Sequence, residues 1–295
     1  MSKRCSMAAC AVLLTLIGLS CVSGVLAGDA QSKKKAILLV AFGTTVPEAQ
    51  IAFSQTESRV KREFPDAEVR WAFTSGKIRA KLAQEGKKTA PPSEALTKLL
   101  KDGYTQITVA SLHTLPGEEF HRLCKDVEAF KEKGGKGLKK VAVSLPLLSS
   151  RKNMEAAAKG LLKHLPKDRK PEDTVILMGH GSEHHPGDAV YAALNFWLLR
   201  LDPNVYVGTV EGNPSFEDVL SELDKKRPGK AYLMPFMAVA GDHARNDLCG
   251  EDDGSWKSIL VKKGWLVECV LKGSAEMPEI LDVWMENIKA AFMDK

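Results

Sequence analysis

Cysteine is scarce in this sequence, and no two cysteines are closely spaced. Six occur in 295 residues, three of them within residues 1–27. The other three, Cys124, Cys249 and Cys269, form no CxxC pair. This number and spacing exclude a disulfide framework, although an exported chain still allows one disulfide. A packed apolar core must therefore stabilise the fold.

A strong excess of one charge is also absent. The chain has 42 Lys and Arg against 37 Asp and Glu, a net charge of +5, and only 6% aromatic residues. No block of Lys and Arg with interleaved aromatic residues occurs, which argues against a nucleic-acid partner. The mild basic excess favours an anionic small-molecule ligand instead.

A long charge-free run occurs at the N-terminus. Lys3-Arg4 precedes residues 5–28, which carry no charge, and Val25-Leu26-Ala27 offers small or modest residues at the positions that a signal peptidase reads. We predict a signal peptide over residues 1–27, and hence a periplasmic protein with no stable membrane insertion after cleavage. The alternative is a retained N-terminal anchor, because the run is long enough to span a bilayer.

Apolar runs alternate with helical patterns along the rest of the chain. Continuous apolar runs are typical of strands that are buried on both faces of a parallel sheet. The expected strands of the first half are residues 36–42, 68–73, 106–112 and 140–145, and similar segments begin again at residues 175, 204, 231 and 264. We predict an α/β fold of two similar lobes, residues 28–168 and 169–295, each with a mainly parallel four-stranded sheet flanked by helices, and a cleft between them.

Three side chains that can bind a metal follow three successive strands of the second lobe. His180 follows the first strand, Glu211 the second and His243 the third. Because the carboxyl ends of parallel strands share one edge of a sheet, we expect these side chains to converge. Two imidazoles and a carboxylate suit a divalent ion such as Co, Ni, Fe or Zn. In the ordinary alternatives His180 only marks a turn, Glu211 is a solvated acid, and His243 bonds to Asp242 or Asp247.

Glycines stand beside all three of these residues. They are Gly179, Gly181, Gly212 and Gly241. Because glycine has no Cβ, these positions would let a flat ligand approach the backbone closely.

Three motifs resemble a known family. Gly179-His-Gly-Ser182, Glu211-Gly-Asn-Pro-Ser215 and Ala240-Gly-Asp-His243, together with the duplicated lobes, resemble the anaerobic sirohydrochlorin cobaltochelatases. These are class II chelatases related in fold to ferrochelatase, and the resemblance covers nearly all of the mature chain. It implies ATP-independent insertion of Co(II) into sirohydrochlorin or precorrin-2 on the cobalamin route. Members of this family are generally cytoplasmic, so the export signal is a departure.

The resemblance also implies roles for individual residues. His180, Glu211 and His243 would handle the metal, and an acid of the first lobe, Glu118 or Glu119, would face the same cleft. We therefore assign catalysis to His180, His243 and Glu119. Either imidazole can act as the base near pH 7, and the metal must be held by an open set of ligands so that it can be released.

Other residues are assigned by their position alone. The substrate has many carboxylates, and the candidates to bind them are Lys77, Arg79, Arg151 and Arg245. His113 either lines the cleft or is a satisfied loop histidine, and His184 and His185 either relay metal or lie at a solvated helix start. His121, near the start of a helix, is a candidate axial ligand to a bound haem.

Two other functions remain open at this point. One is insertion of Fe(II), as in ferrochelatase, and the other is a non-catalytic exported carrier of metal or haem. We also expect the chain to form a homo-oligomer and to bind sirohydrochlorin or a related anionic tetrapyrrole.

Overall fold

The structure of the protein, a computed structural model, describes residues 34–133, 137–182 and 184–294. Residues Lys33–Lys295 form one compact unit. The predicted signal peptide lies outside the described residues. No helix in the described part of the chain is long and apolar enough to cross a membrane.

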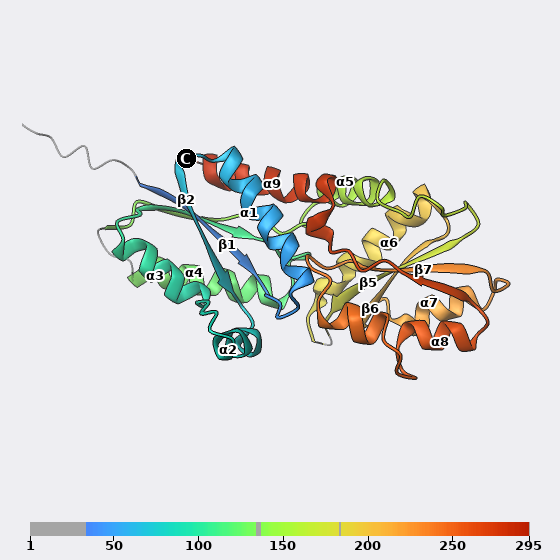
Figure 1. Cartoon of the computed structure of the whole chain (residues 1–295). Coiled ribbons are helices and arrows are strands. Elements are labelled where there is room, and N and C mark those ends of the chain that lie inside the picture. Colours follow the sequence, from blue (N-terminus) through green and yellow to red (C-terminus); the bar gives the residue numbers. More distant parts are fainter. Residues whose placement is uncertain (1–33, 134–136, 183, 295) are drawn as a thin grey trace, which may run out of the picture. The chain divides into compact units, whose positions relative to one another are not determined.

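Two four-stranded parallel sheets form the framework (Figure 1). The first sheet has the order β2-β1-β3-β4, and the second has the equivalent order β6-β5-β7-β8. The strands are β1 (Lys35–Ala41), β2 (Ala67–Phe73), β3 (Gln106–Ser111), β4 (Lys140–Val143), β5 (Thr174–Gly181), β6 (Val205–Glu211), β7 (Lys230–Pro235) and β8 (Leu266–Cys269). The shared order confirms the predicted α/β class and the duplication.

Helices connect the strands in both halves. After the first-sheet strands come η1 (Glu48–Gln50), α1 (Ile51–Glu63), α2 (Gly76–Gln84), α3 (Pro92–Lys101), α4 (Glu118–Lys133) and α5 (Arg151–Leu162). After the second-sheet strands come η3 (Pro186–Asp188), α6 (Ala189–Leu201), α7 (Phe216–Leu223), the π-helical turn η4 (Ala244–Leu248), α8 (Trp256–Lys262), η5 (Ser274–Glu276) and α9 (Pro278–Met293).

Strand β1 shows why its sequence reads as one unbroken apolar run. Ile37 and Leu39 pack into one hydrophobic cluster, whereas Leu38 and Val40 pack into another on the opposite face. All four side chains are fully buried. Successive side chains of a strand point to opposite faces, so a strand covered on both sides needs apolar residues at every position.

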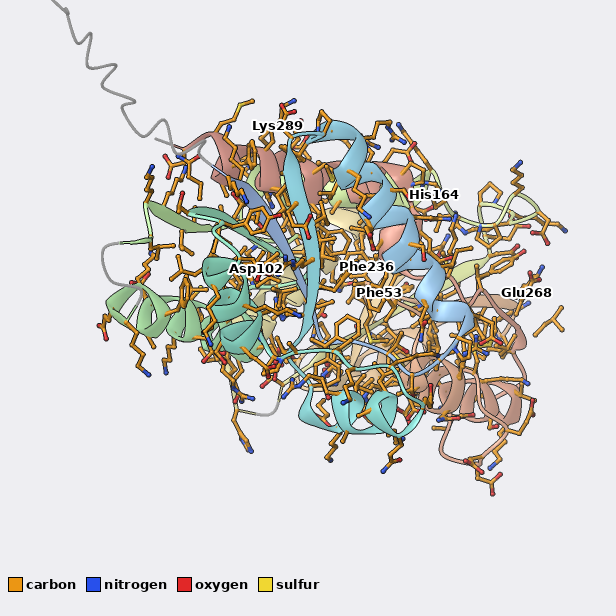
Figure 2. All side chains as sticks on the ribbon, turned by 60° about the vertical axis from the view of Figure 1, so that its left-hand side comes forward. Phe53, Asp102, His164, Phe236, Glu268 and Lys289 are labelled. Atoms are coloured by element: carbon orange, nitrogen blue, oxygen red, sulfur yellow. A yellow bond between two sulfur atoms is a disulfide. The ribbon has the colours of Figure 1, made fainter. Side chains whose placement is uncertain are left out.

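One hydrophobic cluster is shared by the two sheets. It combines Leu39 of β1, Leu177 of β5 and Trp284 of α9. Helices α1, α9, α5 and α6 lie along one side of the sheets, with α3, α4, α7 and α8 on the other (Figure 1). Phe53 of α1 and Phe236, which follows β7, are buried in this shared cluster (Figure 2).

Helices α5 and α9 cross from one half to the other. Helix α5 packs against α6, and α9 packs against β3 of the first sheet. The Trp284 indole of α9 donates to the carbonyl of His113, which follows β3, at 3.2 Å. Helix α9 thus covers the first sheet although its residues belong to the predicted second lobe, residues 169–295, and the division between residues 168 and 169 stays a prediction.

A disulfide joins Cys249 to Cys269. It links the end of η4 to the last residue of the edge strand β8. The expectation that the chain can form one disulfide is confirmed, and Cys124 is a free, partly buried thiol.

Candidate active site

The carboxyl ends of the two sheets face each other. The ring of Phe42, after β1, lies 6.4 Å from that of His180 at the end of β5. Arg245 of η4 donates to Glu48 of η1 at 3.2 Å. Ligands of open α/β sheets bind beyond the carboxyl ends of the strands. The chain therefore places the predicted residues at the edge where such a fold binds its ligands.

His180 is held so that one ring nitrogen is available. Its Nδ1 lies 3.0 Å from the carbonyl oxygen of Gly181. A carbonyl only accepts hydrogen bonds, so Nδ1 carries the proton and Nε2 has the free lone pair when the ring is neutral. Metal-binding histidines commonly donate their second ring N–H to a carbonyl or a carboxylate in this way.

His243 is held in the same sense by a carboxylate. It is the residue before the π-helical turn η4, and its Nδ1 pairs with Asp247 one turn later. The side chains are 37% and 46% exposed, so solvent reaches this pair. His243 thus makes the hydrogen bond to Asp247 that was one of the alternatives to metal binding. This bond leaves Nε2 available, and the carboxylate would stabilise a positive charge on the imidazole.

The two imidazoles lie together. Their ring centroids are 4.8 Å apart and their planes meet at 86°. Glu211 is placed beside them only through its backbone, because Gly181 pairs with Glu211 where β5 and β6 end, and its side chain is exposed. Across the described residues no three His, Cys, Asp or Glu side chains are grouped closely enough to hold a metal ion. The three-ligand set stays a prediction, with two of its members in contact.

The glycines beside the site have a different use from the one expected. A Cβ on Gly179 would lie 2.6 Å from the ring of Tyr191, and one on Gly212 would lie 1.8 Å from the carboxylate of Asp188. A Cβ on Gly181 would lie 1.8 Å from the carbonyl oxygen of Glu211. Protein atoms therefore fill the space beside these three glycines. At Gly241 a Cβ would meet only Oγ1 of Thr44 at 3.5 Å and Val239 at 3.9 Å, so the expectation that glycines admit a flat ligand stays a prediction there, whereas at the other three the missing Cβ makes room for protein atoms.

The first half contributes two unpartnered buried atoms near the end of β3. They are Nε2 of His113 and Oε2 of Glu119, neither of which has a hydrogen-bond partner among the described residues. Burial lowers the pKa of His113 to about 4, so this ring is neutral near pH 7. Arg122 pairs with both acids of this turn, with Oε1 of Glu118 at 2.6 Å and with Oε1 of Glu119 at 3.4 Å, so only Oε2 of Glu119 is left without a partner. Buried polar groups are normally paired, so Glu119 is the better candidate for a substrate contact.

The four basic candidates differ in what they contact. Arg79 donates to the carbonyls of Phe73 and Thr74 at 2.5 and 2.8 Å, so it caps the end of β2. Arg151 lies over the ring of Trp197, 5.5 Å from its centroid. These contacts give Arg79 and Arg151 structural roles. Lys77, an exposed side chain, and Arg245 remain candidates for binding carboxylates, and Arg245 would exchange its exposed partner Glu48 for a carboxylate of the substrate.

A second pair of histidines joins the two halves. Nδ1 of His121, on α4, lies 3.0 Å from Nε2 of His185, which follows β5. The amide of Gly187 donates to Nδ1 of His185 at 2.9 Å. A neutral His185 therefore carries its proton on Nε2 and donates it to His121. His184 is exposed beside this pair.

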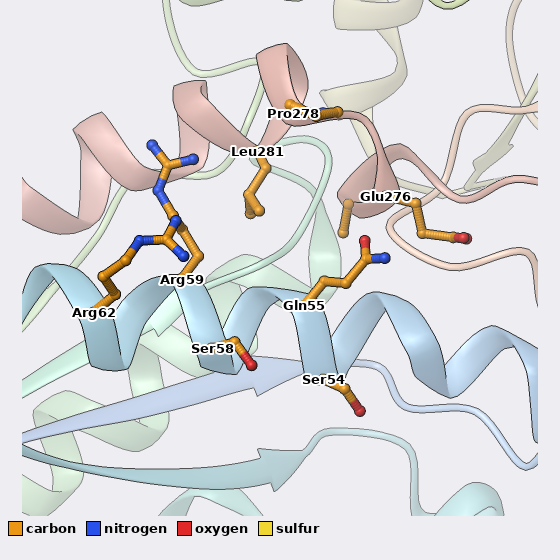
Figure 3. Close-up of a pocket in the computed structure, with 9 residues that line it drawn as sticks. Ser54, Gln55, Ser58, Arg59, Arg62, Glu276, Pro278 and Leu281 are labelled. Carbon is orange, nitrogen blue, oxygen red and sulfur yellow. The ribbon is translucent and has the colours of Figure 1, made fainter.

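A groove of about 360 Å³ lies away from these residues, between α1 and the start of α9 (Figure 3). Its lining is Ser54, Gln55, Ser58, Arg59, Arg62, Ala275, Glu276, Pro278 and Leu281. None of the predicted site residues is among them. Arg59 is already paired with Glu63 and Asp282.

Two curated proteins are similar to most of this chain. The sirohydrochlorin cobaltochelatase CbiKC of Nitratidesulfovibrio vulgaris Hildenborough is 40% identical over 258 residues, which cover 88% of this chain and 90% of that protein. The sirohydrochlorin cobaltochelatase of Salmonella typhimurium is 32% identical over 260 residues, which cover 88% of this chain and 96% of that protein.

A solved structure shares the fold at low sequence identity. The structure of SirB from Bacillus subtilis with Fe3+ has a TM-score of 0.60 and 16% identity, and the match covers 88% of this chain and 96% of that one. This likeness shows the fold alone. The sequence profile described as cobalt chelatase (CbiK) matches residues 35–293, and the chain therefore belongs to the CbiK family of cobalt chelatases.

Proposed function

We propose that the protein inserts Co(II) into sirohydrochlorin, or its relative precorrin-2, without ATP. The names of the two relatives support the substrate. The observation that carries the proposal is the pair of imidazoles at the carboxyl ends of the strands, 4.8 Å apart between centroids, each with Nδ1 engaged and Nε2 available.

Insertion exchanges two protons for one metal ion. Two pyrrole N–H protons leave the macrocycle as Co(II) loses water and enters, so the charge on the ring stays balanced. His180, His243 and Glu211 share the two tasks of holding the ion and accepting the protons. Only the imidazoles are in contact, so the ion is held by an open set of ligands, which is what allows it to be transferred.

The first half supplies the opposite wall of the site in this proposal. Glu119 and His113 present buried polar atoms without partners. A neutral His113 offers a hydrogen bond without bringing a positive charge close to the incoming metal. Lys77 and Arg245 bind carboxylates at the edge of the macrocycle.

An absorbance assay distinguishes this function from the alternatives. Purified protein is mixed with sirohydrochlorin and either Co(II) or Fe(II), and conversion is followed by the change in the visible spectrum. We expect many turnovers with Co(II), strongly reduced in His180→Ala and His243→Ala. His164→Ala is the matched control, because His164 pairs with Glu279 away from the site.

Two outcomes would contradict the assignment. Faster turnover with Fe(II) than with Co(II) would favour the ferrochelatase-type alternative. Conversion of no more than one equivalent per protein would favour an exported carrier of metal or haem.

We also propose that the protein is periplasmic and forms a homo-oligomer. The N-terminal apolar run supports export, and the Cys249–Cys269 disulfide is of a kind that persists in oxidising compartments. Cell fractionation with mass determination of the N-terminus tests export, and light scattering tests assembly. A cytoplasmic protein with residues 1–27 intact would contradict the first proposal, and a monomer the second.

Haem binding at His121 is a further part of the proposal. His121 is exposed on α4, which supports access to a large ligand. Because His185 donates to its Nδ1, a neutral His121 carries its proton on Nε2, so His185 must turn away before Nε2 can bind iron. A Soret band in the purified protein, lost in His121→Ala, is the expected result. A colourless preparation after supply of haem would contradict it.

A further inference from the structure

The carboxylate of Asp188 is buried between the loops that follow β5 and β6. Asp188 is 6% exposed. Its Oδ2 accepts a hydrogen bond from the amide of Ser182 at 2.9 Å. A Cβ on Gly212 would lie only 1.8 Å from the same oxygen, so the backbone of Gly212 packs directly against it. One oxygen therefore contacts the loop that follows His180 and the loop that follows Glu211.

Tyr191 fixes the other side of His180. It lies in the first turn of α6 and is 1% exposed. Its ring packs against Gly179, where a Cβ would lie 2.6 Å away. Its hydroxyl makes a hydrogen bond with the backbone of His180, while burial raises the pKa of the phenol. The residues on both sides of His180 are thus held by side chains from η3 and α6.

These contacts begin where the sheet ends. The ladder between β5 and β6 stops at the pair Gly181–Glu211. Gly181 has a φ of +80°, so the strand conformation is also lost there. Beyond this pair no ladder hydrogen bonds between described residues set the spacing of the two loops. Asp188 and Tyr191 provide the contacts that replace them.

Stability alone explains Asp188 poorly. Its Oδ1 is buried and has no hydrogen-bond partner among the described residues. Burying a carboxylate with incomplete hydrogen bonding costs free energy. A role in holding the two loops accounts for a charged residue at this position.

We propose that Asp188 and Tyr191 are positioning residues for the metal site. They set the distance between His180 and Glu211 without touching the metal or the macrocycle. The inference rests on the proposed function, because it takes His180 and Glu211 as the residues that receive Co(II). Neither Asp188 nor Tyr191 belongs to the motifs that mark the family resemblance.

The test measures Co(II) binding and catalysis separately. Isothermal titration of the full chain with Co(II), without tetrapyrrole, gives the affinity, and the insertion assay gives kcat and KM for Co(II). Asp188→Ala should weaken Co(II) binding by about ten- to a hundredfold, the usual effect of losing a contact that orients metal ligands. Asp188→Asn should largely restore binding, because its amide oxygen can accept the Ser182 hydrogen bond.

Tyr191→Phe is the second, milder variant. It keeps the ring against Gly179 and removes only the hydroxyl, so we expect about threefold weaker Co(II) binding, with no loss of folding. Hydrogen exchange gives a readout independent of activity. The Ser182 amide should exchange faster in Asp188→Ala than in the parent, and at the parental rate in Asp188→Asn.

Clear results would overturn the inference. Parental Co(II) affinity in a folded Asp188→Ala would do so, as would an Asp188→Asn protein as weak as Asp188→Ala. If Asp188→Ala does not fold, Gly212→Ala displaces the same carboxylate from the opposite side, and unchanged Co(II) affinity there would equally refute the role.

Failure of the proposed function gives a different pattern. If the parent binds Co(II) and inserts none, the function is wrong while the titrations still decide the role of Asp188. If His180→Ala binds Co(II) as the parent does, the site itself is wrong. If His180→Ala loses binding and the Asp188 and Tyr191 variants do not, only the present inference fails.

Discussion

Removing the Cys249–Cys269 disulfide should destabilise the protein by about 3 kcal/mol. The bridge closes a segment with a sequence separation of 20. The loop-closure entropy of a segment of this length is about 11 cal/mol/K, or about 3 kcal/mol at room temperature. For a chain of this size, such a loss lowers the unfolding midpoint by roughly 6 to 12 °C.

The position of the disulfide in the fold predicts which property of the protein changes when the bridge is removed. Strand β8 has four residues and pairs only with β7 among the described strands, so its far edge is unsupported. The η4 turn is also held by Ala244 and Leu248, which are fully buried. We therefore expect global stability to fall, while the activity of the folded enzyme at room temperature changes little.

Thermal unfolding, followed by circular dichroism, tests this directly. The parent is compared with and without a phosphine reductant, and with a Cys249→Ser, Cys269→Ser double variant. Cys124→Ser is the matched control, because Cys124 is a free thiol and should leave the midpoint unchanged. Equal midpoints for parent and double variant would refute the reasoning, as would alkylation of Cys249 in the unreduced native protein.

Three further predictions concern single side chains. Asp247→Asn keeps an acceptor for the His243 N–H but removes the charge of a half-exposed pair, so the Co(II) affinity measured by titration should fall about fivefold. Asp247→Ala removes the acceptor as well and should weaken Co(II) binding by about ten- to a hundredfold. Unchanged affinity in both variants would contradict the pairing. Burial lowers the pKa of His113 from 6.5 to about 4, so below pH 6.5 the unfolded chain binds a proton that the folded chain does not. The contribution of His113 to the free energy of unfolding is complete above pH 6.5, and about 3 kcal/mol of it is lost as the pH falls toward 4. In urea unfolding, the parent should therefore lose stability more steeply over this pH range than His113→Gln. Equal pH dependence of the two proteins would argue against a buried neutral ring. Arg79 caps two carbonyls, so Arg79→Lys should lower the free energy of unfolding in urea by about 1 kcal/mol. The KM for the tetrapyrrole should stay unchanged. A raised KM would indicate that Arg79 contacts the substrate.

Much of the fold could be predicted because its determinants are local. The apolar run of β1 and the Gly-His-Gly sequence that ends β5 specify buried strands and a turn regardless of their surroundings. The repetition of that pattern predicted two equivalent sheets, which the common strand order confirms. The three motifs around His180, Glu211 and His243 led to the cobaltochelatase family, which the family match also confirms.

The crossing of α9 could not be predicted in the same way. The helix itself is specified by its periodic apolar residues, including Ile280, Trp284 and Ile288. The sheet that it covers depends on which apolar surfaces remain open after the whole chain folds. Periodicity identifies a buried face and not the partner of that face.

The sequence by itself determined the strands and helices, the repetition of their pattern, and the candidate residues at the strand ends. Only the tertiary structure decided that His180 and His243 lie side by side, that Arg79 caps a strand, and that Asp188 and Tyr191 fill the space beside the glycines. The physical reason is the range of the interactions. Strands, turns and caps depend on residues a few positions apart, whereas a contact between loops depends on side-chain packing across the fold, which no local pattern records.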